Sequence, residues 1–223
     1  MLQDRIYIDD FEKFIDLEVR DRHYPKCYAL AHSMGGAILA GYLLRDSVTF
    51  DAAALCAPMI GVNLPMPHWL ASFIVERAEP RRSVRNDYAV STGKWQPLPY
   101  LINVLTHSQE RYRRYLRYYA DYPELRLGGP TYHWLRESFA IGKELVAKAG
   151  EIETPLMLLE ASEEKVVSNR ELQAFCQSRQ KAQTGREEKL PLIIEGAHHE
   201  ILFEIDALRA MALNAICDFF EQN

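Results

Sequence analysis

The sequence lacks the long hydrophobic runs that a membrane-spanning protein needs. No stretch of its 223 residues approaches the roughly 18 consecutive apolar residues of a transmembrane helix. The N-terminal segment MLQDRIYIDDFEKF also lacks the basic region followed by apolar residues that marks a signal peptide. We therefore expect a cytoplasmic protein.

Signals for disulfides, metal clusters and nucleic-acid binding are also scarce. The four cysteines form no C-x-x-C pair and sit in apolar runs, which favours small buried side chains: Cys27, Cys56, Cys176 and Cys217. The net charge of −5 argues against a nucleic-acid partner. A composition that is 48% hydrophobic and 26% charged, without repeats or low-complexity tracts, is typical of an ordinary globular protein.

Short apolar runs alternate with helical patterns along much of the chain. Four runs read as buried strands: residues 27–31, 51–58, 155–161 and 190–197. Helical patterns are predicted at 8–20, 36–45, 169–180 and 206–221, and the polar stretch 179–189 is predicted to be a solvated loop. This alternation predicts an α/β fold with a parallel sheet.

Residues 60–140 interrupt the alternation and differ in composition. They contain all three tryptophans, eight of the twelve tyrosines, and 11 lysines and arginines against 7 acidic residues, a net charge of +4. We interpret this segment as an inserted helical cap between two core segments, 1–59 and 141–223. Within it, the run 111–119 predicts a helix with an arginine face beside a tyrosine stripe. That face is either solvated or meets anionic headgroups at a membrane surface.

A serine follows the first predicted strand in a pattern that favours a nucleophile. The stretch AHSMGG, residues 31–36, places small residues two before and two after Ser33, as the sharp strand-to-helix turn of a G-x-S-x-G motif requires. Alanine replaces the first glycine, and Gly36 adds further room for the following helix. The N–H of Met34 would then be one donor to an oxyanion.

The residues that would activate this serine follow in the expected order of acid, then histidine. The third strand is followed by Glu163 and Glu164, and the fourth by His198 and His199. The carboxyl ends of parallel strands meet at one edge of a sheet, where ligands bind and catalytic residues lie. The spacing alone does not decide which glutamate is the acid or which histidine is the base.

Four motifs carry a resemblance that covers essentially the whole chain. AHSMGG, CAPM, the segment from Asn103 to Trp134 and GAHHEILFE resemble the monoacylglycerol-lipase-like branch of the serine hydrolases, and most closely its bacterial lysophospholipases. The resemblance implies an α/β-hydrolase fold, a lysophospholipid or monoacylglycerol substrate, no cofactor or metal, and a triad of Ser33, His199 and Glu164. Glutamate stands where many relatives have aspartate, which leaves Glu163 as the alternative acid.

Neighbouring histidines have simpler interpretations. His32 is expected to be a structural part of the turn, and His198 a wall or supporting residue of the pocket. The run beginning at His199 is similar to the zinc-binding pattern H-E-x-x-H, but its fifth position is Phe203, which argues against that metal site.

The resemblance also predicts that part of the fold lies outside this chain. About 26 residues precede the first strand, where a complete hydrolase of this kind has several strands, so we expect an N-terminally truncated fold. Ser33 would then follow an apolar edge strand, and the loop that supplies a second oxyanion donor would be missing. This predicts a poorly soluble or impaired chain, and the alternative function is a fragment that binds lipid or a complementary chain.

Overall fold

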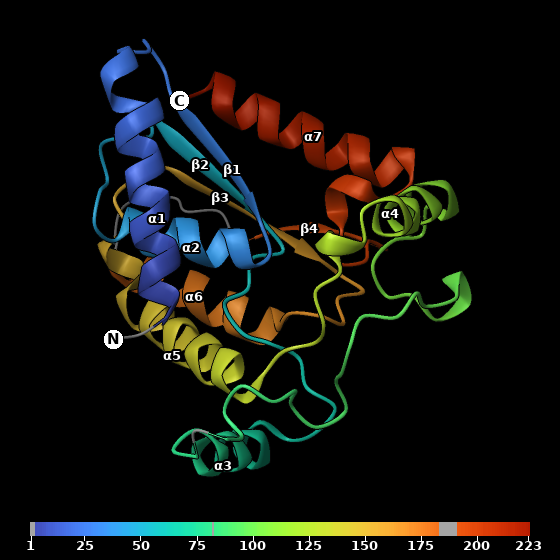
Figure 1. Ribbon diagram of the computed structural model, residues 1–223. Helices are drawn as coiled ribbons and strands as arrows, with labels where there is room; N and C mark the ends of the chain where they lie inside the picture. Colours follow the sequence, from blue (N-terminus) through green and yellow to red (C-terminus); the bar gives the residue numbers. More distant parts are fainter. Residues whose placement is uncertain (1–2, 82, 183–190) are drawn as a thin grey trace.

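The computed structural model describes residues 3–81, 83–182 and 191–223, and its centre is a parallel sheet. Four strands lie in the order β1 (Tyr28–His32), β2 (Ala52–Cys56), β3 (Leu156–Ala161) and β4 (Leu192–Ile194) (Figure 1). Each pair of neighbours is parallel. The parallel α/β sheet and its four strands are confirmed, but the fourth strand is shorter than the predicted 190–197, of which residue 190 lies outside the described part of the chain.

The central and edge strands differ in burial. All five residues of β2 are buried, because strands flank it on both sides and helices cover the sheet. β1 pairs only with β2 and lies at the edge of the described sheet, where the side chains of Tyr28 and Leu30 are exposed. Within the described residues, the strand that precedes Ser33 is therefore the apolar edge that the sequence predicts.

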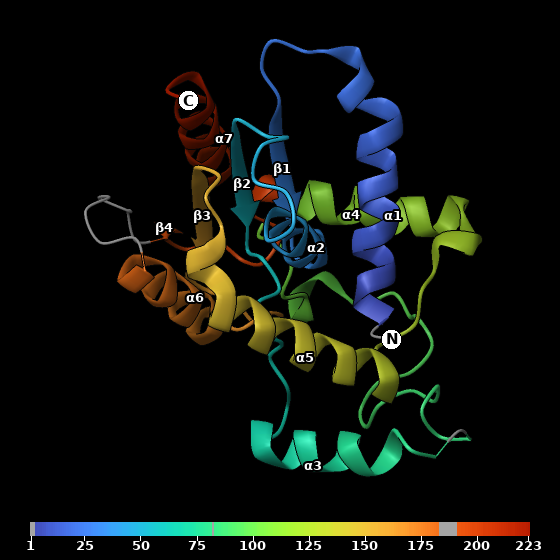
Figure 2. The same cartoon turned by 90° about the vertical axis from the view of Figure 1, so that its left-hand side faces the viewer.

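Helices cover both faces of the sheet. One face packs against α7 (Asp206–Glu221), and the other against α2 (Met34–Leu43) and α6 (Asn169–Ala182) (Figures 1 and 2). A further layer is formed by α1 (Gln3–Glu18) and α5 (Tyr132–Lys148), which both contact α2. The opening helix thus begins and ends a little earlier than the predicted 8–20.

The predicted loop at 179–189 is wrong in its first part. α6 continues to Ala182, and Arg179 is only 2% exposed. Its guanidinium donates hydrogen bonds to the backbone carbonyls of Ile152 and Thr154, which lets a charged residue lie inside the fold. Residues 183–189 lie outside the described part of the chain.

The segment predicted as a cap contains α3 (His68–Ala78) and α4 (Gln109–Asp121), with α3 lying apart from the sheet (Figures 1 and 2). A small apolar cluster of Val75, Ala89 and Leu135 lies here, separate from the main core. α5 crosses the predicted boundary at residue 140 and contributes Leu145 to the main core. The division into 1–59, 60–140 and 141–223 remains a prediction.

The predicted tyrosine stripe lies along α4. Tyr112 stacks on Tyr115, and Tyr115 contacts Tyr119 edge-on. Tyr112 is buried, whereas three of the four arginines of the same helix are exposed: Arg113, Arg114 and Arg117. The helix begins at an N-cap, where the hydroxyl of Ser108 accepts a hydrogen bond from the N–H of Arg111.

Short 3-10 helices lie between several of the longer elements. The 3-10 helices are η1 (Arg20–Arg22), η2 (Tyr100–Ile102), η3 (Pro123–Leu125), η4 (Ala149–Glu151) and η5 (Ile201–Phe203). Cys56 and Cys176 are buried and Cys27 is partly buried, but Cys217 is exposed, so its predicted burial is wrong. Every helix in the described ranges is too short or too polar to span a bilayer.

Candidate active site

Ser33 occupies a strained turn between β1 and α2. Its φ of 52° and ψ of −122° are values that a non-glycine residue rarely adopts. The turn is held by hydrogen bonds from Ser33 N–H to the carbonyl of Cys56 (3.1 Å) and from Met59 N–H to the carbonyl of Ser33 (2.9 Å). This conformation presents the side chain at the carboxyl end of the sheet, as a nucleophile elbow does.

The steric demand for glycine falls on Gly36. A Cβ atom there would lie 2.7 Å from Cβ of Pro58, so only glycine lets α2 pack this closely against the segment after β2. Gly35, to which the motif assigned this role, has no described atom within 4 Å of the same position. The packing therefore confirms the prediction that Gly36 gives the following helix room to pack.

Ser33, His199 and Glu164 lie in hydrogen-bonding contact although 35 to 166 residues separate them in sequence. The Oγ of Ser33 lies 3.0 Å from Nε2 of His199, and Nδ1 of His199 lies 2.7 Å from Oε2 of Glu164. Glu164 follows β3 and His199 follows β4, so parallel strands deliver all three residues to the same edge of the sheet. These distances allow proton transfer between serine and histidine.

Glu164 is held as a carboxylate despite its burial. Burial by itself would raise the pKa of its carboxyl group, but the hydrogen bond from His199 and two backbone N–H groups outweigh this and lower the pKa below its usual value. The N–H groups of Val166 and Val167 donate to Oε1 at 2.7 and 3.2 Å. The charged carboxylate fixes the Nδ1–H tautomer of His199 and leaves Nε2 free to accept a proton.

His32 supports His199 from the other side. Its Nε2 donates a hydrogen bond to the backbone carbonyl of His199 (3.1 Å), and the two rings lie 4.7 Å apart. This contact fits the structural role expected for His32, because it holds the loop of His199 against the end of β1.

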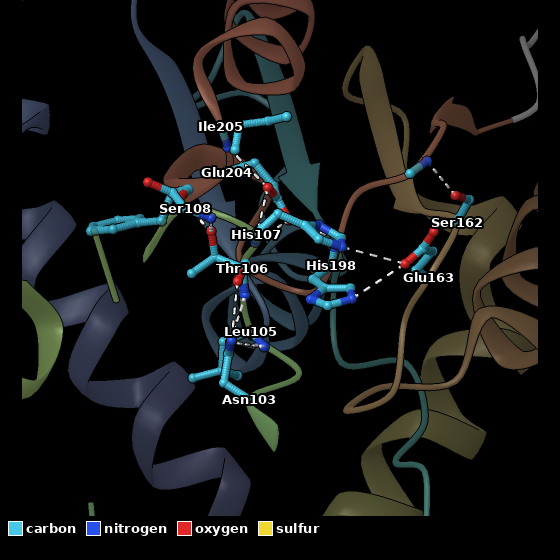
Figure 3. Close-up of polar contacts among 12 residues, drawn as sticks. Asn103, Leu105, Thr106, His107, Ser108, Ser162, Glu163, His198, Glu204 and Ile205 are labelled. Atoms are coloured by element: carbon cyan, nitrogen blue, oxygen red, sulfur yellow. Dashed lines mark hydrogen bonds and ion pairs between the residues drawn. The ribbon is translucent and has the colours of Figure 1, made fainter. Parts of the chain in front are cut away.

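Glu163 and His198 face His107 rather than Ser33. Oε2 of Glu163 lies 3.3 Å from Nε2 of His198 and 3.6 Å from Nε2 of His107, a residue of the segment before α4 (Figure 3). The rings of His198 and His107 are 3.8 Å apart. The geometry therefore brings Glu164 and His199 to Ser33, and Glu163 and His198 to His107.

Glu204 is a residue of this site to which the sequence analysis assigned no role. Its side chain is fully buried and accepts hydrogen bonds from the N–H groups of His107, His198 and Ile205 and from Nδ1 of His107 (Figure 3). Burial would raise the pKa of this carboxyl group, but these donors together lower it. The motif GAHHEILFE contains Glu204, yet its partner His107 lies 97 residues away, so local spacing carries no signal for the contact.

Further hydrogen bonds join the same two segments. The N–H of Glu200 donates to the carbonyl of Leu105 (2.9 Å), and the hydroxyl of Thr106 donates to the carbonyl of Phe203 (2.7 Å). Arg111 donates to the carbonyl of Glu204 (2.6 Å). The loop that carries His199 is thus fastened to the predicted cap by both backbone and side-chain contacts.

Met34 combines two features that suit ester chemistry. As the first residue of α2 it has no partner for its N–H within the helix, and the positive end of the helix dipole lies there. Its side chain also lines an apolar pocket between α1, α2 and α5, together with Tyr7, Ile8, Ala37, Ile38, Met59 and Ile141. The N–H of Met34 is therefore able to donate to an oxyanion beside Ser33.

Known proteins share the sequence pattern and the fold of this chain. Residues 3–206 match the family described as serine aminopeptidase S33, whose general name is Hydrolase_4. Lysophospholipase L2 of Escherichia coli strain K12 is 51% identical over 217 residues, which are 97% of this chain and 64% of that protein. The chain therefore spans less than two thirds of the length of this relative.

Solved structures with the same arrangement have low sequence identity. The monoacylglycerol lipase of Paleococcus ferrophilus superposes with a TM-score of 0.70 at 13% identity, covering 97% of this chain and 76% of that one. A soluble variant of the monoglyceride lipase of Saccharomyces cerevisiae gives a TM-score of 0.70 at 15% identity, covering 96% and 68%. The predicted α/β-hydrolase fold is confirmed.

Proposed function

The chain belongs to the serine aminopeptidase S33 family of hydrolases, and we propose that it cleaves the acyl ester of lysophospholipids or monoacylglycerols. The observation that carries this proposal is the chain of contacts from Ser33 through His199 to Glu164, at 3.0 and 2.7 Å. The relative named lysophospholipase L2, 51% identical to this chain, supports the choice of substrate class.

The first half of the reaction forms an acyl-enzyme. Ser33 Oγ attacks the ester carbonyl carbon while Nε2 of His199 accepts the hydroxyl proton, and Glu164 stabilises the resulting imidazolium. The N–H of Met34 donates to the oxyanion of the tetrahedral intermediate. The intermediate collapses as His199 returns the proton to the leaving glycerol oxygen, and the acyl group stays on Ser33.

The second half releases the fatty acid. His199 takes a proton from a water molecule, whose oxygen attacks the acyl-enzyme carbonyl, and Ser33 leaves with the proton that His199 delivers. This cycle consumes one water molecule and needs no metal or cofactor.

The surroundings of Met34 and the surface of α4 support a lipid substrate. The side chain of Met34, the residue after Ser33, lies among apolar residues that include Ile38 and Met59. The aromatic stripe of α4 and the exposed arginines on the same helix support peripheral contact with anionic membrane lipids. We place this contact at the inner face of the cell membrane.

The experiment that tests the proposal measures both labelling and turnover. Wild-type protein should react with a fluorophosphonate probe and release fatty acid from lysophosphatidylcholine, lysophosphatidylethanolamine or monoacylglycerol, and Ser33→Ala should do neither. An aminoacyl p-nitroanilide tests the peptidase activity that the family name describes. Faster cleavage of that amide than of every ester would overturn the substrate assignment.

The alternative function is a hydrolase fragment of low activity that binds lipid or a complementary chain. The exposed apolar side chains of Tyr28 and Leu30 on the edge strand β1 favour it, since such an edge can pair with another strand. A folded protein that binds the lipids but shows neither labelling nor turnover would support this alternative.

A further inference from the structure

Three potential metal ligands from separate segments meet beside the proposed triad. His107 comes from the predicted cap, Glu163 from the loop after β3 and His198 from the loop after β4 (Figure 3). Each offers one ligand atom, and the three atoms all lie within 4.8 Å of one another. The mechanism proposed above uses none of these side chains.

The two distances from Glu163 to the histidines are close to those between ligands of a tetrahedral transition metal. Bonds of 2.0–2.1 Å at tetrahedral angles separate ligand atoms by about 3.3 Å. Oε2 of Glu163 lies 3.3 Å from Nε2 of His198 and 3.6 Å from Nε2 of His107. The rings of His107 and His198 lie 3.8 Å apart with an angle of 34° between their planes, so binding an ion requires the rings to rotate until both lone pairs point to it.

A buried carboxylate prepares His107 to be a ligand. Oε1 of Glu204 lies 3.0 Å from Nδ1 of His107, so Nδ1 carries the proton and donates it. In the neutral ring, Nε2 then presents a lone pair towards the carboxylate oxygen of Glu163. Two such atoms repel each other unless a proton or a metal ion lies between them, and a carboxylate on the far nitrogen is the usual support of a metal-binding histidine.

His198 presents its outer nitrogen to the same point. Its Nδ1 is buried and has no hydrogen-bond partner among the described residues, whereas Nε2 faces Glu163. The N–H of His198 donates to Glu204, so the same carboxylate that orients His107 also holds the backbone of the second histidine.

We propose that His107, Glu163 and His198 bind one divalent transition-metal ion, of which Zn²⁺ is the representative case. Two imidazoles and one carboxylate suit Zn²⁺, Ni²⁺ or Cu²⁺, whereas Mg²⁺ and Ca²⁺ prefer oxygen ligands. The ion fastens the predicted cap to the loops that carry Glu164 and His199, and water fills its remaining position.

A second group of possible ligands, His32, His199 and Glu200, is a weaker candidate. Both ring nitrogens of His199 already make hydrogen bonds, to Ser33 and to Glu164, and Nε2 of His32 donates to a backbone carbonyl. An ion there would have to displace these contacts.

Isothermal titration of tag-free, metal-stripped protein with ZnCl₂ tests the proposal. We expect one ion per chain with micromolar affinity, and a tenfold or greater loss in His107→Ala, His198→Ala and Glu163→Gln, because losing even a supporting partner of a ligand costs about 10- to 100-fold. His68→Ala, an exposed histidine on α3, and Glu200→Gln are the matched controls and should bind as the wild type does. The visible absorption of bound Co²⁺ should show tetrahedral coordination by the wild type and change in each ligand variant.

Two outcomes would overturn the proposal. One is the absence of stoichiometric Zn²⁺ binding by the wild type. The other is binding that Glu200→Gln abolishes and His107→Ala retains, since it would locate the ion at the other group. Circular dichroism of each variant confirms that a lost signal reflects a lost ligand, and Glu163, which is half exposed, can be replaced without disturbing the core.

Discussion

Two adjacent pairs of residues, Glu163 with Glu164 and His198 with His199, have opposite environments. The inner pair, Glu164 and His199, is almost completely buried and contacts Ser33. The outer pair, Glu163 and His198, is more exposed and contacts His107 of the predicted cap. The side chains of adjacent residues in a loop project in different directions. Each residue of the proposed triad in these loops is therefore the direct sequence neighbour of a residue of the proposed ion site.

Residue type alone therefore does not assign a role at this edge of the sheet. The two carboxylates differ in their hydrogen-bond donors. Glu164 accepts hydrogen bonds from two backbone N–H groups and from the ring of His199. The two histidines differ in their contacts, since His199 contacts both a carboxylate and Ser33.

The histidines should give the largest contrast. We expect His199→Ala to lower kcat/KM on an activated ester by about 10⁴ to 10⁶, because Ser33 loses its base. His198→Ala should lower it less than about tenfold. The measurement is the rate of p-nitrophenyl ester hydrolysis at matched protein concentration, with Ser33→Ala as the reference for complete loss. A more damaging His198→Ala would reverse the assignment of the base.

The carboxylates should give the next largest contrast. Glu164→Gln keeps the size of the side chain but cannot hold the imidazolium, and a comparable change in a serine protease triad costs about 10⁴ in kcat. Glu163→Gln should leave kcat within a few-fold of the wild type. Small and equal effects of the two substitutions would remove both residues from the mechanism.

The cap differs from the outer pair in carrying exposed positive charge, on Arg113, Arg114 and Arg117 of α4. Replacing Arg113, Arg114 and Arg117 with glutamine should weaken sedimentation with anionic vesicles by about 10²-fold at low salt, at roughly 1 kcal/mol per residue. The effect should shrink as salt screens the charges. Glutamine substitutions at three other exposed residues, Lys13, Lys26 and Lys143, serve as the control. Equal binding by the two triple variants would show that the arginine face is simply solvated.

Much of this arrangement could be predicted because it follows from local patterns. Buried strands appear as apolar runs, and the turn at Ser33 has a motif. The order of serine, acid and histidine along the chain then brings the three residues to one edge of the sheet. The choice between Glu163 and Glu164 depended on the family resemblance, since neither residue differs in its local pattern.

Other features depend on contacts that no spacing reveals. Arg179 lies in a polar stretch that is typical of a loop, yet two backbone carbonyls from the segment before β3 allow its burial. The exposure of Cys217 depends on which face of α7 meets the sheet. The pairing of Glu204 with His107 joins the last loop to the cap, and only the folded chain brings them together.

Glu204 gives the smallest expected effect, and it tests whether the outer pair supports the inner one. In Glu204→Gln one carboxylate oxygen becomes an NH₂ group, which faces backbone N–H donors and cannot accept from them. Leaving such buried groups unpaired lowers the free energy of unfolding by on the order of 2 kcal/mol, which lowers Tm by about 5 °C. Because the N–H of His198 is one of these donors, the backbone next to His199 should loosen, and we expect kcat to fall about tenfold with little change in KM. Glu195→Gln, an exposed carboxylate in the same loop, is the matched control and should change neither quantity. A lowered Tm with an unchanged kcat would show that Glu204 stabilises the loop without positioning His199.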